Sequence, residues 1–250
     1  MKSKIKVGAV SYLNTKPLLY GIEASDIKEK IELSLAYPAQ LARQLREGSI
    51  DMALMPVAAL QEIEGARIVA DYGIAANGNV VSVALFSQVP IEEIDIVILD
   101  YQSRTSVRLT QLLFAEYWKK EVTFVAADPD FILEIKGNTA AVIIGDRALA
   151  QLPNFNYNYD LSAAWKAYTG LPFVFAAWVS NKDLPQDFLA EFNAANAIGL
   201  AHLDEIAEAN SIPYYSLKTY YNDNICYQLG EAEKKGLALF LQKISTAQNS

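Results

Sequence analysis

Residues 7–20, Val-Gly-Ala-Val-Ser-Tyr-Leu-Asn-Thr-Lys-Pro-Leu-Leu-Tyr, decide the fold. The apolar run from Ile5 to Val10 is typical of a buried strand, and Pro17 stands where a helix can begin. Between them lies a polar elbow, residues 11–16. In open α/β sheets such an elbow lies beyond the carboxyl end of a strand, where a helix start offers free N–H groups. The stretch therefore predicts one wall of a small-molecule site.

The composition indicates a folded globular protein with one large domain or two modest ones. The chain has 250 residues, of which 52% are apolar and 20% are charged, enough to bury a sizeable core. A formal net charge of -8 argues against nucleic acid or anionic membranes as partners, but not against a small anion. No apolar run approaches the ~20 residues that span a bilayer, and no signal core follows the N-terminal lysines. We therefore expect a cytoplasmic protein.

The hydrophobic pattern predicts two α/β blocks, one nested inside the other. Strand-like and helix-like runs alternate up to Ile63, which indicates a parallel sheet with right-handed crossovers. A second α/β series begins near Pro90 and ends near Pro172. The polar residues 153–159 are typical of a loop, and the chain from residue 186 onward has helical spacing.

Two extended runs, near residues 80–90 and 172–180, connect the blocks. Two crossings of this kind predict a hinge, with a ligand cleft between the lobes. We therefore expect a two-lobed α/β protein whose second lobe is inserted into the first. The prediction assigns residues 1–88 and 174–250 to lobe 1, and residues 89–173 to lobe 2.

Four polar elbows follow predicted strands, at residues 11–16, 55–57, 100–106 and 145–147. In a two-lobed protein they face the cleft from both sides. Besides hydroxyl, amide and helix N–H groups they contain three cations, Lys16, Arg104 and Arg147. Such groups suit one or two carboxylates or a phosphate. A carboxylate fits better, because the glycine motifs of phosphate and dinucleotide sites are absent from the sequence.

These residues also have purely structural interpretations. Elbow serines and threonines can cap helices, as can Asp146 after Gly145. Lys16 and Arg104 can be solvated surface charges. A polar residue in an apolar run, such as Ser82, can bond a neighbouring carbonyl group.

The chain has one histidine, His202, and one cysteine, Cys226. Both lie far from the elbows in the sequence. An intrachain disulfide is therefore excluded, and neither a Cys/His zinc site nor a Ser-His-Asp triad is expected. We expect no metal and no cofactor.

Residues 11–18, Ser-Tyr-Leu-Asn-Thr-Lys-Pro-Leu, resemble the N-terminal signature of the chorismate dehydratases, which open the futalosine route to menaquinone. Further stretches resemble the same family in the same order, at 51–56, 81–87, 100–109, 145–149 and 159–176. The resemblance ends near residue 180. It implies a fold similar to type II periplasmic binding proteins, which agrees with the nested lobes. One departure is Ala164, since the family's pattern has an acidic residue just before the tryptophan found here at Trp165.

The resemblance implies a hydro-lyase that removes water from chorismate to give 3-[(1-carboxyvinyl)oxy]benzoate. Loss of the C3 proton and the C4 hydroxide makes the ring aromatic, so the reaction is strongly downhill. The resemblance also implies Asn14 and Ser82 as the catalytic pair, bonded to the reacting ring or the leaving group. No elbow supplies a histidine or glutamate base, so the enolpyruvyl carboxylate of the substrate is a candidate base. Positioning and electrostatics would then carry most of the barrier reduction.

The expected substrate site adds groups from the elbows to this pair. The hydroxyl groups of residues 103–106 would bind a carboxylate at their helix N-terminus. The expected substrate-binding residues are Ser11, Tyr12, Thr15, Pro56, Ser103, Arg104, Thr105, Ser106, Gly145 and Asp146. The expected partner is a small dicarboxylate, with no nucleic acid and no membrane, and the oligomeric state is left open.

Three alternatives stay open beside this hypothesis. A non-catalytic receptor for small anions on the same fold would be expected to carry an export signal or lipid anchor. The sister enzyme, 1,4-dihydroxy-6-naphthoate synthase, would be expected to have a histidine near the site, and His202 is badly placed for that. A sensory domain of a transcription factor would usually carry a DNA-binding helix pair.

Overall fold

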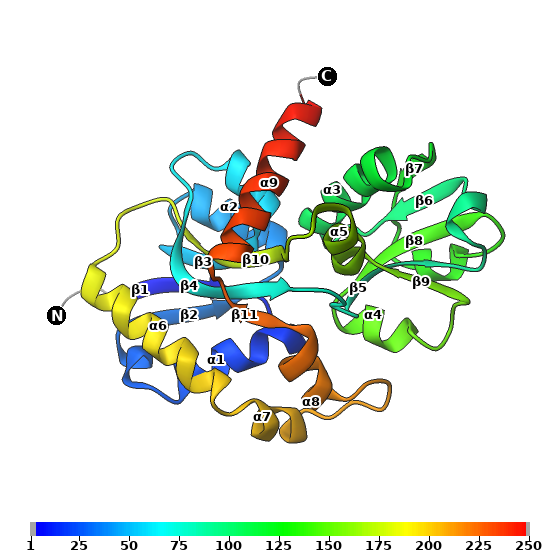
Figure 1. Ribbon diagram of the computed structural model, residues 1–250. Helices are drawn as coiled ribbons and strands as arrows, with labels where there is room; N and C mark the ends of the chain where they lie inside the picture. Colours follow the sequence, from blue (N-terminus) through cyan, green and yellow to red (C-terminus); the bar gives the residue numbers. More distant parts are fainter. Residues whose placement is uncertain (1–3, 249–250) are drawn as a thin grey trace.

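Two α/β lobes lie side by side in the computed structural model, which describes residues 4–248 (Figure 1). The first lobe holds a six-stranded sheet in the order β11-β4-β10-β3-β1-β2. Its strands are β1 Ile5–Ala9, β2 Ile31–Leu35, β3 Met52–Pro56, β4 Arg67–Ala76, β10 Phe173–Ser180 and β11 Cys226–Gln228. The second lobe holds a five-stranded sheet in the order β7-β6-β8-β5-β9. Its strands are β5 Val83–Ser87, β6 Ile96–Leu99, β7 Thr123–Ala126, β8 Thr139–Ile144 and β9 Tyr157–Asp160.

Helices cover both sheets. The α-helices are α1 Lys16–Glu23, α2 Pro38–Arg46, α3 Thr105–Leu112, α4 Asp146–Gln151, α5 Leu161–Thr169, α6 Gln186–Leu200, α7 Leu203–Ala209, α8 Leu217–Thr219 and α9 Glu231–Gln248. Four shorter turns bear on the site: the 3-10 turns η1 Leu13–Thr15 and η3 Val57–Glu62, and the π-helical turns η5 Leu113–Trp118 and η7 Tyr220–Asn224. Within residues 4–248, every helix is too short or too polar to span a bilayer.

The strand pairing confirms the predicted parallel start of the chain. In the first sheet β1 lies between β2 and β3 and is parallel to both, while β10 is antiparallel to β3 and β4. In the second sheet β6 is parallel to β7 and β8, and β5 runs antiparallel between β8 and β9. The carboxyl ends of the parallel strands carry the elbows at residues 11–16 and 100–106.

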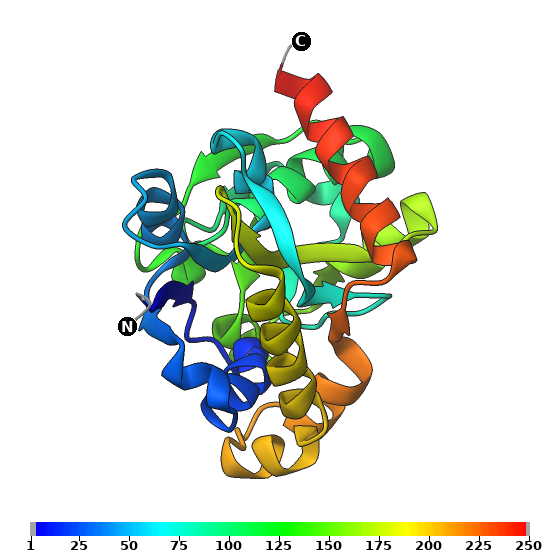
Figure 2. The ribbon, with the colours of Figure 1, turned by 90° about the vertical axis from the view of Figure 1, so that its left-hand side faces the viewer.

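Helix α1, which begins at the first elbow, is held tightly against α6. A Cβ atom on Gly21 would lie 1.9 Å from the carbonyl oxygen of Ala195, and one on Gly199 would lie 1.7 Å from that of Pro17. Only glycine allows the two backbones to approach this closely. Figure 2 shows α6 lying in front of the first sheet. The close packing fixes the position of the elbow relative to the sheet.

The chain crosses between the lobes at residues 77–82 and again at 170–172. Residues 83–87, which the sequence analysis placed in lobe 1, form β5 and pair with β8 and β9 of the second sheet. The boundary predicted near residue 88 is therefore corrected to a point before β5. An apolar strand shows that it is buried, but its composition does not show which sheet it joins. The return crossing lies just before β10 and close to the predicted boundary.

Three other predictions of local structure are corrected. Part of the expected loop at 153–159 is the edge strand β9, which stays polar because its outer edge has no neighbouring strand in the described chain. The helical C-terminal region is interrupted by the short strand β11, which pairs with β4. The helical run from residue 186 is also broken, because α6 ends at Leu200 and α7 starts at Leu203.

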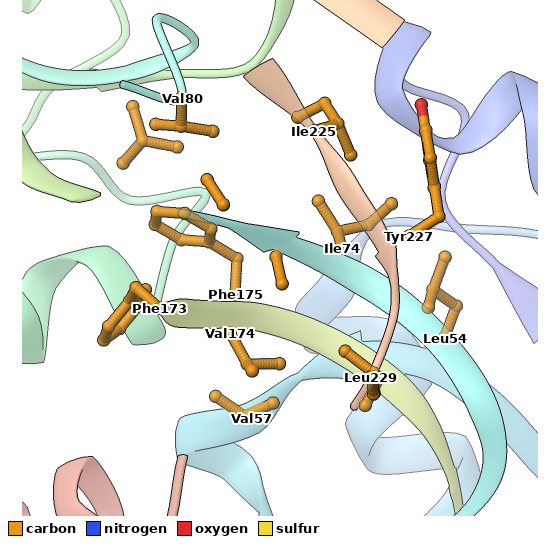
Figure 3. Packing of buried hydrophobic residues seen from close by; sticks show 14 of the residues in the cluster. Leu54, Val57, Ile74, Val80, Phe173, Val174, Phe175, Ile225, Tyr227 and Leu229 are labelled. Atoms are coloured by element: carbon orange, nitrogen blue, oxygen red, sulfur yellow. The ribbon is translucent and has the colours of Figure 1, made fainter. Parts of the chain in front are cut away.

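The core of the first lobe extends toward the second. Figure 3 shows Ile74 on β4 near Ile225, which precedes β11, and Phe175 and Leu229 belong to the same cluster of buried residues. Helix α9 contacts β10 in the first lobe and α3 in the second. The region where the lobes meet is therefore formed by segments from the start, middle and end of the chain.

Candidate active site

A pocket with about 610 Å³ of empty space, its mouth included, lies between the two lobes. Its apolar lining comes from both lobes and from the first crossing: Val10, Pro38, Leu54, Ile74, Val80, Val83, Ile144, Phe175 and Ala176. Such a lining suits the faces of a carbon ring, with orientation left to the polar groups.

Most of the predicted site residues line this pocket. They come from four elbows and the first crossing: Tyr12, Asn14, Pro56, Ser82, Ser103, Thr105, Ser106 and Gly145. The lining also contains Gln102, which the sequence analysis did not select although it lies within a predicted elbow. The structure thus brings together residues that are far apart in the sequence, and beside the pocket Leu13 contacts Asp146, 133 positions away.

Four predicted residues lie outside the lining. Thr15 is fully buried behind Asn14. Ser11 and Asp146 line a neighbouring hollow at the outer side of the cleft. Arg104 forms an ion pair with Glu62 of η3, so its guanidinium group is directed to a carboxylate of the protein. This placement agrees with the structural interpretation of Arg104 rather than with the expected ligand contact.

Asn14 lies on η1, directly after β1. The Thr15 hydroxyl is 3.2 Å from Asn14 Oδ1 and donates a hydrogen bond to it. With its oxygen bonded in this way, the amide nitrogen of Asn14 is left to donate its protons. The elbow therefore presents a hydrogen-bond donor to the pocket.

Ser82 is held by a strained turn in the first crossing. Its N–H donates to the carbonyl oxygen of Val80 at 2.7 Å, which closes a γ-turn around Val81. Val81 has a φ of 57°, a left-handed conformation that a β-branched side chain rarely adopts. Strain of this kind costs about 1–3 kcal/mol and is found mostly at functional sites.

Two bonds from other segments hold this turn in place. The N–H of Val81 donates to Asp160 Oδ2 at 2.7 Å, and the N–H of Gly145 donates to the carbonyl oxygen of Ser82 at 2.7 Å. Asp160 also caps α5 by accepting from the N–H of Ala163 at 2.9 Å. Burial raises the pKa of Asp160, although its backbone N–H partners oppose the rise.

The N-terminus of α3 closes one side of the pocket. Ser103 Oγ accepts from the N–H of Ser106 at 3.0 Å, so Ser103 has the capping role that its sequence position allowed. Thr105 Oγ1 instead accepts from the N–H of Ala58, 3.2 Å away in the first lobe. A helix N-terminus with hydroxyl groups beside it is suited to a carboxylate.

Further bonds join the lobes at the rim of the pocket. Tyr12 donates from its hydroxyl to Gln102 Oε1 at 3.2 Å, and burial raises the pKa of Tyr12 to about 12. Asp146 Oδ1 accepts from the N–H of Leu13 at 3.1 Å. Asp146 is therefore a contact between the lobes, and the N-cap of α4 is Gly145 instead. Burial raises the pKa of Asp146, while the bond from Leu13 and the charge of Lys16 oppose the rise.

Arg147, the cation of the fourth elbow, is also paired with a carboxylate of the protein. Arg147 donates to both carboxylate oxygens of Asp100, at 2.8 and 2.6 Å, and the Asp100 side chain is fully buried. Asp100 further accepts from the N–H groups of Gln102 and Ile144. The ion pair shapes the elbow around Gln102, and the pocket lining among the described residues contains no cation.

Tyr220, at the start of η7, is a further residue of this region that sequence reasoning missed. Its hydroxyl donates to Ser82 Oγ at 2.6 Å, and both residues are fully buried. Burial raises the pKa of Tyr220, and the Ser82 hydroxyl and the Asn14 side chain oppose the rise. Because the contact joins residues 138 positions apart, no local pattern could have indicated it.

Comparison with solved structures places the fold among the periplasmic-binding-protein-like folds. A protein from Archaeoglobus fulgidus superposes with a TM-score of 0.78 at 17% identity, over 98% of each chain. A Candida albicans protein described as having the generic periplasmic binding protein fold gives a TM-score of 0.62 at 12% identity, over 97% of this chain and 90% of that one. The aliphatic sulphonate binding protein SsuA of Escherichia coli gives 0.63 at 14% identity, over 100% and 93%. The predicted two-lobed fold is confirmed.

Two relatives of known name are both chorismate dehydratases. The one from Thermus thermophilus is 27% identical over 267 aligned residues, which cover 95% of this chain and 94% of the relative. The one from Campylobacter jejuni is 27% identical over 246 residues, which cover 94% and 95%. The sequence pattern of the family described as menaquinone biosynthesis matches residues 5–246. These matches confirm the resemblance that residues 11–18 indicated, and the chain belongs to the menaquinone biosynthesis family.

Proposed function

We propose that this protein is a chorismate dehydratase, which removes water from chorismate to give 3-[(1-carboxyvinyl)oxy]benzoate. The observation that carries the proposal is the pocket between the lobes, where Asn14 and Ser82 reach one largely apolar space beside the N-terminus of α3. Membership of the menaquinone biosynthesis family supports it, as do the names of the two relatives. A ring with two carboxylates matches an apolar pocket rimmed by hydroxyl groups, amides and helix N–H groups.

Among the described residues no cation lines this pocket, although Arg147 lines the hollow that adjoins it. The N-terminus of α3, with Ser103 and Ser106 beside it, is the best site for one of the two carboxylates. The Tyr12 hydroxyl orients Gln102, whose amide nitrogen can donate to the other carboxylate. Since these groups are held by bonds within the protein, they need little reorganisation when the substrate binds.

The base in this proposal is the substrate itself. Tyr12 is the one titratable side chain among the lining residues, and burial raises its pKa to about 12. A protonated phenol is a poor acceptor for the C3 proton near neutral pH. The enolpyruvyl carboxylate would therefore take this proton as the C3–H bond breaks.

Loss of the leaving group completes the reaction. The C4–O bond breaks as the ring becomes aromatic. The departing hydroxide takes the proton that the enolpyruvyl carboxylate removed from C3, so that water leaves and the carboxylate is regenerated. Asn14 and Ser82 would donate hydrogen bonds to this oxygen as negative charge develops on it. Donors that are already fixed in place stabilise this charge without having to reorganise during the reaction.

The direct test is to incubate the purified protein with chorismate and to follow the products by chromatography. We expect 3-[(1-carboxyvinyl)oxy]benzoate to form, at an unchanged rate when EDTA is present. No turnover, together with tight binding of chorismate or another anion, would instead identify a receptor. Independence of metal and cofactor stays a prediction, which the EDTA arm tests, and the cytoplasmic location also stays a prediction.

A further inference from the structure

We propose that Tyr220 is a positioning residue, which fixes the Ser82 hydroxyl so that its proton points into the pocket. The inference rests on the proposed function of Ser82. It concerns a residue that does not line the pocket and lies in the C-terminal segment, outside the motifs that resemble the chorismate dehydratases.

The backbone bonds of Ser82 leave its hydroxyl as the group available to a ligand. The backbone N–H of Ser82 donates to Val80, and its carbonyl oxygen accepts from Gly145. The Tyr220 hydroxyl, 2.6 Å away, donates into the serine oxygen. A hydroxyl has one proton to donate, so the donor direction of Tyr220 decides where the serine proton points.

Burial keeps the hydroxyl group of Tyr220 protonated, so that it has a proton to donate. Its ring is fully buried, and burial raises the pKa of the phenol, so the proton stays on Tyr220 throughout the neutral range. With the bond in the direction Tyr220 to Ser82, Ser82 Oγ keeps its own proton for another partner. The pocket side is where a departing hydroxide would need that proton.

The segment that carries Tyr220 is tied to the crossing that carries Ser82. Tyr220 begins the π-helical turn η7, and such turns are frequent at functional sites. At the end of the turn, the amide of Asn224 donates to the carbonyl oxygen of Asn79 at 3.1 Å. The η7 segment thus contacts the crossing at two points, Asn79 and the Ser82 hydroxyl.

Neighbouring tyrosines show that this bond is particular to Tyr220. Tyr221 and Tyr227 are buried as well, but within the described chain their hydroxyl groups have no hydrogen-bond partner. Figure 3 shows Tyr227 on β11, at the other end of the same packed region from Val80. Tyr227→Phe is therefore a matched control, because it removes a buried phenol hydroxyl that bonds nothing in this region.

The test compares Tyr220→Phe with Tyr227→Phe in steady-state turnover of chorismate by the full chain. We expect kcat to fall roughly tenfold in Tyr220→Phe, as for the loss of one hydrogen bond in the transition state, with KM within about twofold. Tyr227→Phe should keep the wild-type kcat. Thermal unfolding of both variants establishes that they are folded.

A double-mutant cycle separates positioning from a general structural role. If Tyr220 acts through Ser82, Tyr220→Phe should cause no further loss of kcat when Ser82→Ala is already present. Losses that multiply, or an unchanged kcat in Tyr220→Phe, would overturn the inference. Should Tyr220→Phe not fold, Asn224→Ala releases the same segment from Asn79. A loss of kcat without a change in KM would support the inference, and an unchanged kcat would overturn it.

Wild-type activity separates the two proposals. An inactive wild-type protein overturns the proposed function, and the inference about Tyr220 with it. An active wild-type protein whose kcat does not respond to Tyr220→Phe overturns the inference alone.

Discussion

At the residue scale, Asn14 and Ser82 are placed at the pocket by two different kinds of backbone turn. Asn14 sits on a 3-10 turn after a buried parallel strand, with its amide oriented by the Thr15 hydroxyl. Ser82 sits on a γ-turn whose central valine has a φ of 57°. The first arrangement is local and relaxed, whereas the second depends on bonds from Asp160 and Gly145. The two groups therefore differ in how strongly they depend on the rest of the fold.

Replacement of Asn14 by alanine tests its role. We expect Asn14→Ala to lower kcat by about 100-fold, the size of effect seen when one fixed donor to a developing negative charge is lost. Steady-state turnover of chorismate measures it, and Asn154→Ala is the control, since Asn154 is exposed in the second lobe. Full turnover by Asn14→Ala would remove Asn14 from the mechanism.

At the element scale, Asp160 connects the first crossing to α5. Its carboxylate accepts from Val81 in the strained turn and from Ala163 in the first turn of the helix. One buried side chain thus caps a helix and holds the turn that presents Ser82. The strain at Val81 persists because the surrounding bonds impose it.

Asp160→Ala should both destabilise the protein and reduce activity. The loss of a helix cap together with a buried acceptor for Val81 should lower the free energy of unfolding by about 2–3 kcal/mol. Denaturant unfolding measures this loss, and kcat should fall because the turn at Ser82 is released. Asp187→Ala is the control, because Asp187 is exposed at the start of α6. Unfolding within 0.5 kcal/mol of the wild-type value, roughly the scale of surface changes, would contradict the anchoring role.

At the scale of the whole molecule, side chains of one lobe bond the backbone of the other. Asp146 of the second lobe accepts from Leu13, and Thr105 accepts from Ala58. Helix α9 adds a third connection, where Lys243 donates to Tyr168 at 3.1 Å and pairs with Glu116. These contacts hold the two lobes together beside the pocket.

The buried carboxylate of Asp146 makes the stability of the folded protein depend on pH. Burial raises the pKa of Asp146 above its usual value of 3.8, so the folded protein binds the proton more tightly than the unfolded chain. Its favourable contribution is complete below the unfolded pKa and is lost as pH rises through the folded pKa. Asp146→Asn imitates the protonated form and keeps an acceptor for Leu13.

We therefore expect Asp146→Asn to raise the melting temperature at pH 7, with a difference from wild type that shrinks toward pH 4. Thermal unfolding across this range measures it. The control is Asp187→Asn, the same substitution at an exposed position at the start of α6. A stabilisation that grows on acidification would contradict the assigned direction of the pKa shift.

Much of the architecture could be predicted because it depends on local patterns of apolar and polar residues. The strand, elbow and helix of residues 5–23 follow from an apolar run, a polar elbow and a proline at the helix start. The elbows at 100–106 and 145–147 follow from the same pattern of an apolar strand, a polar elbow and a helix. In the structure they border the pocket. Alternation of strands and helices also predicted the parallel pairing of β1, β2 and β3 and the inserted second lobe.

Only the tertiary structure decided the partners of these elements. In it, β5 joins the second sheet, Arg104 forms an ion pair with Glu62, and Tyr220 forms a hydrogen bond with Ser82. Strand pairing, ion pairs and buried hydrogen bonds join residues far apart in the chain, and their geometry depends on how the lobes pack. The amino-acid sequence by itself therefore determined the fold class and the position of the cleft. Which side chains meet within the cleft was decided by long-range packing.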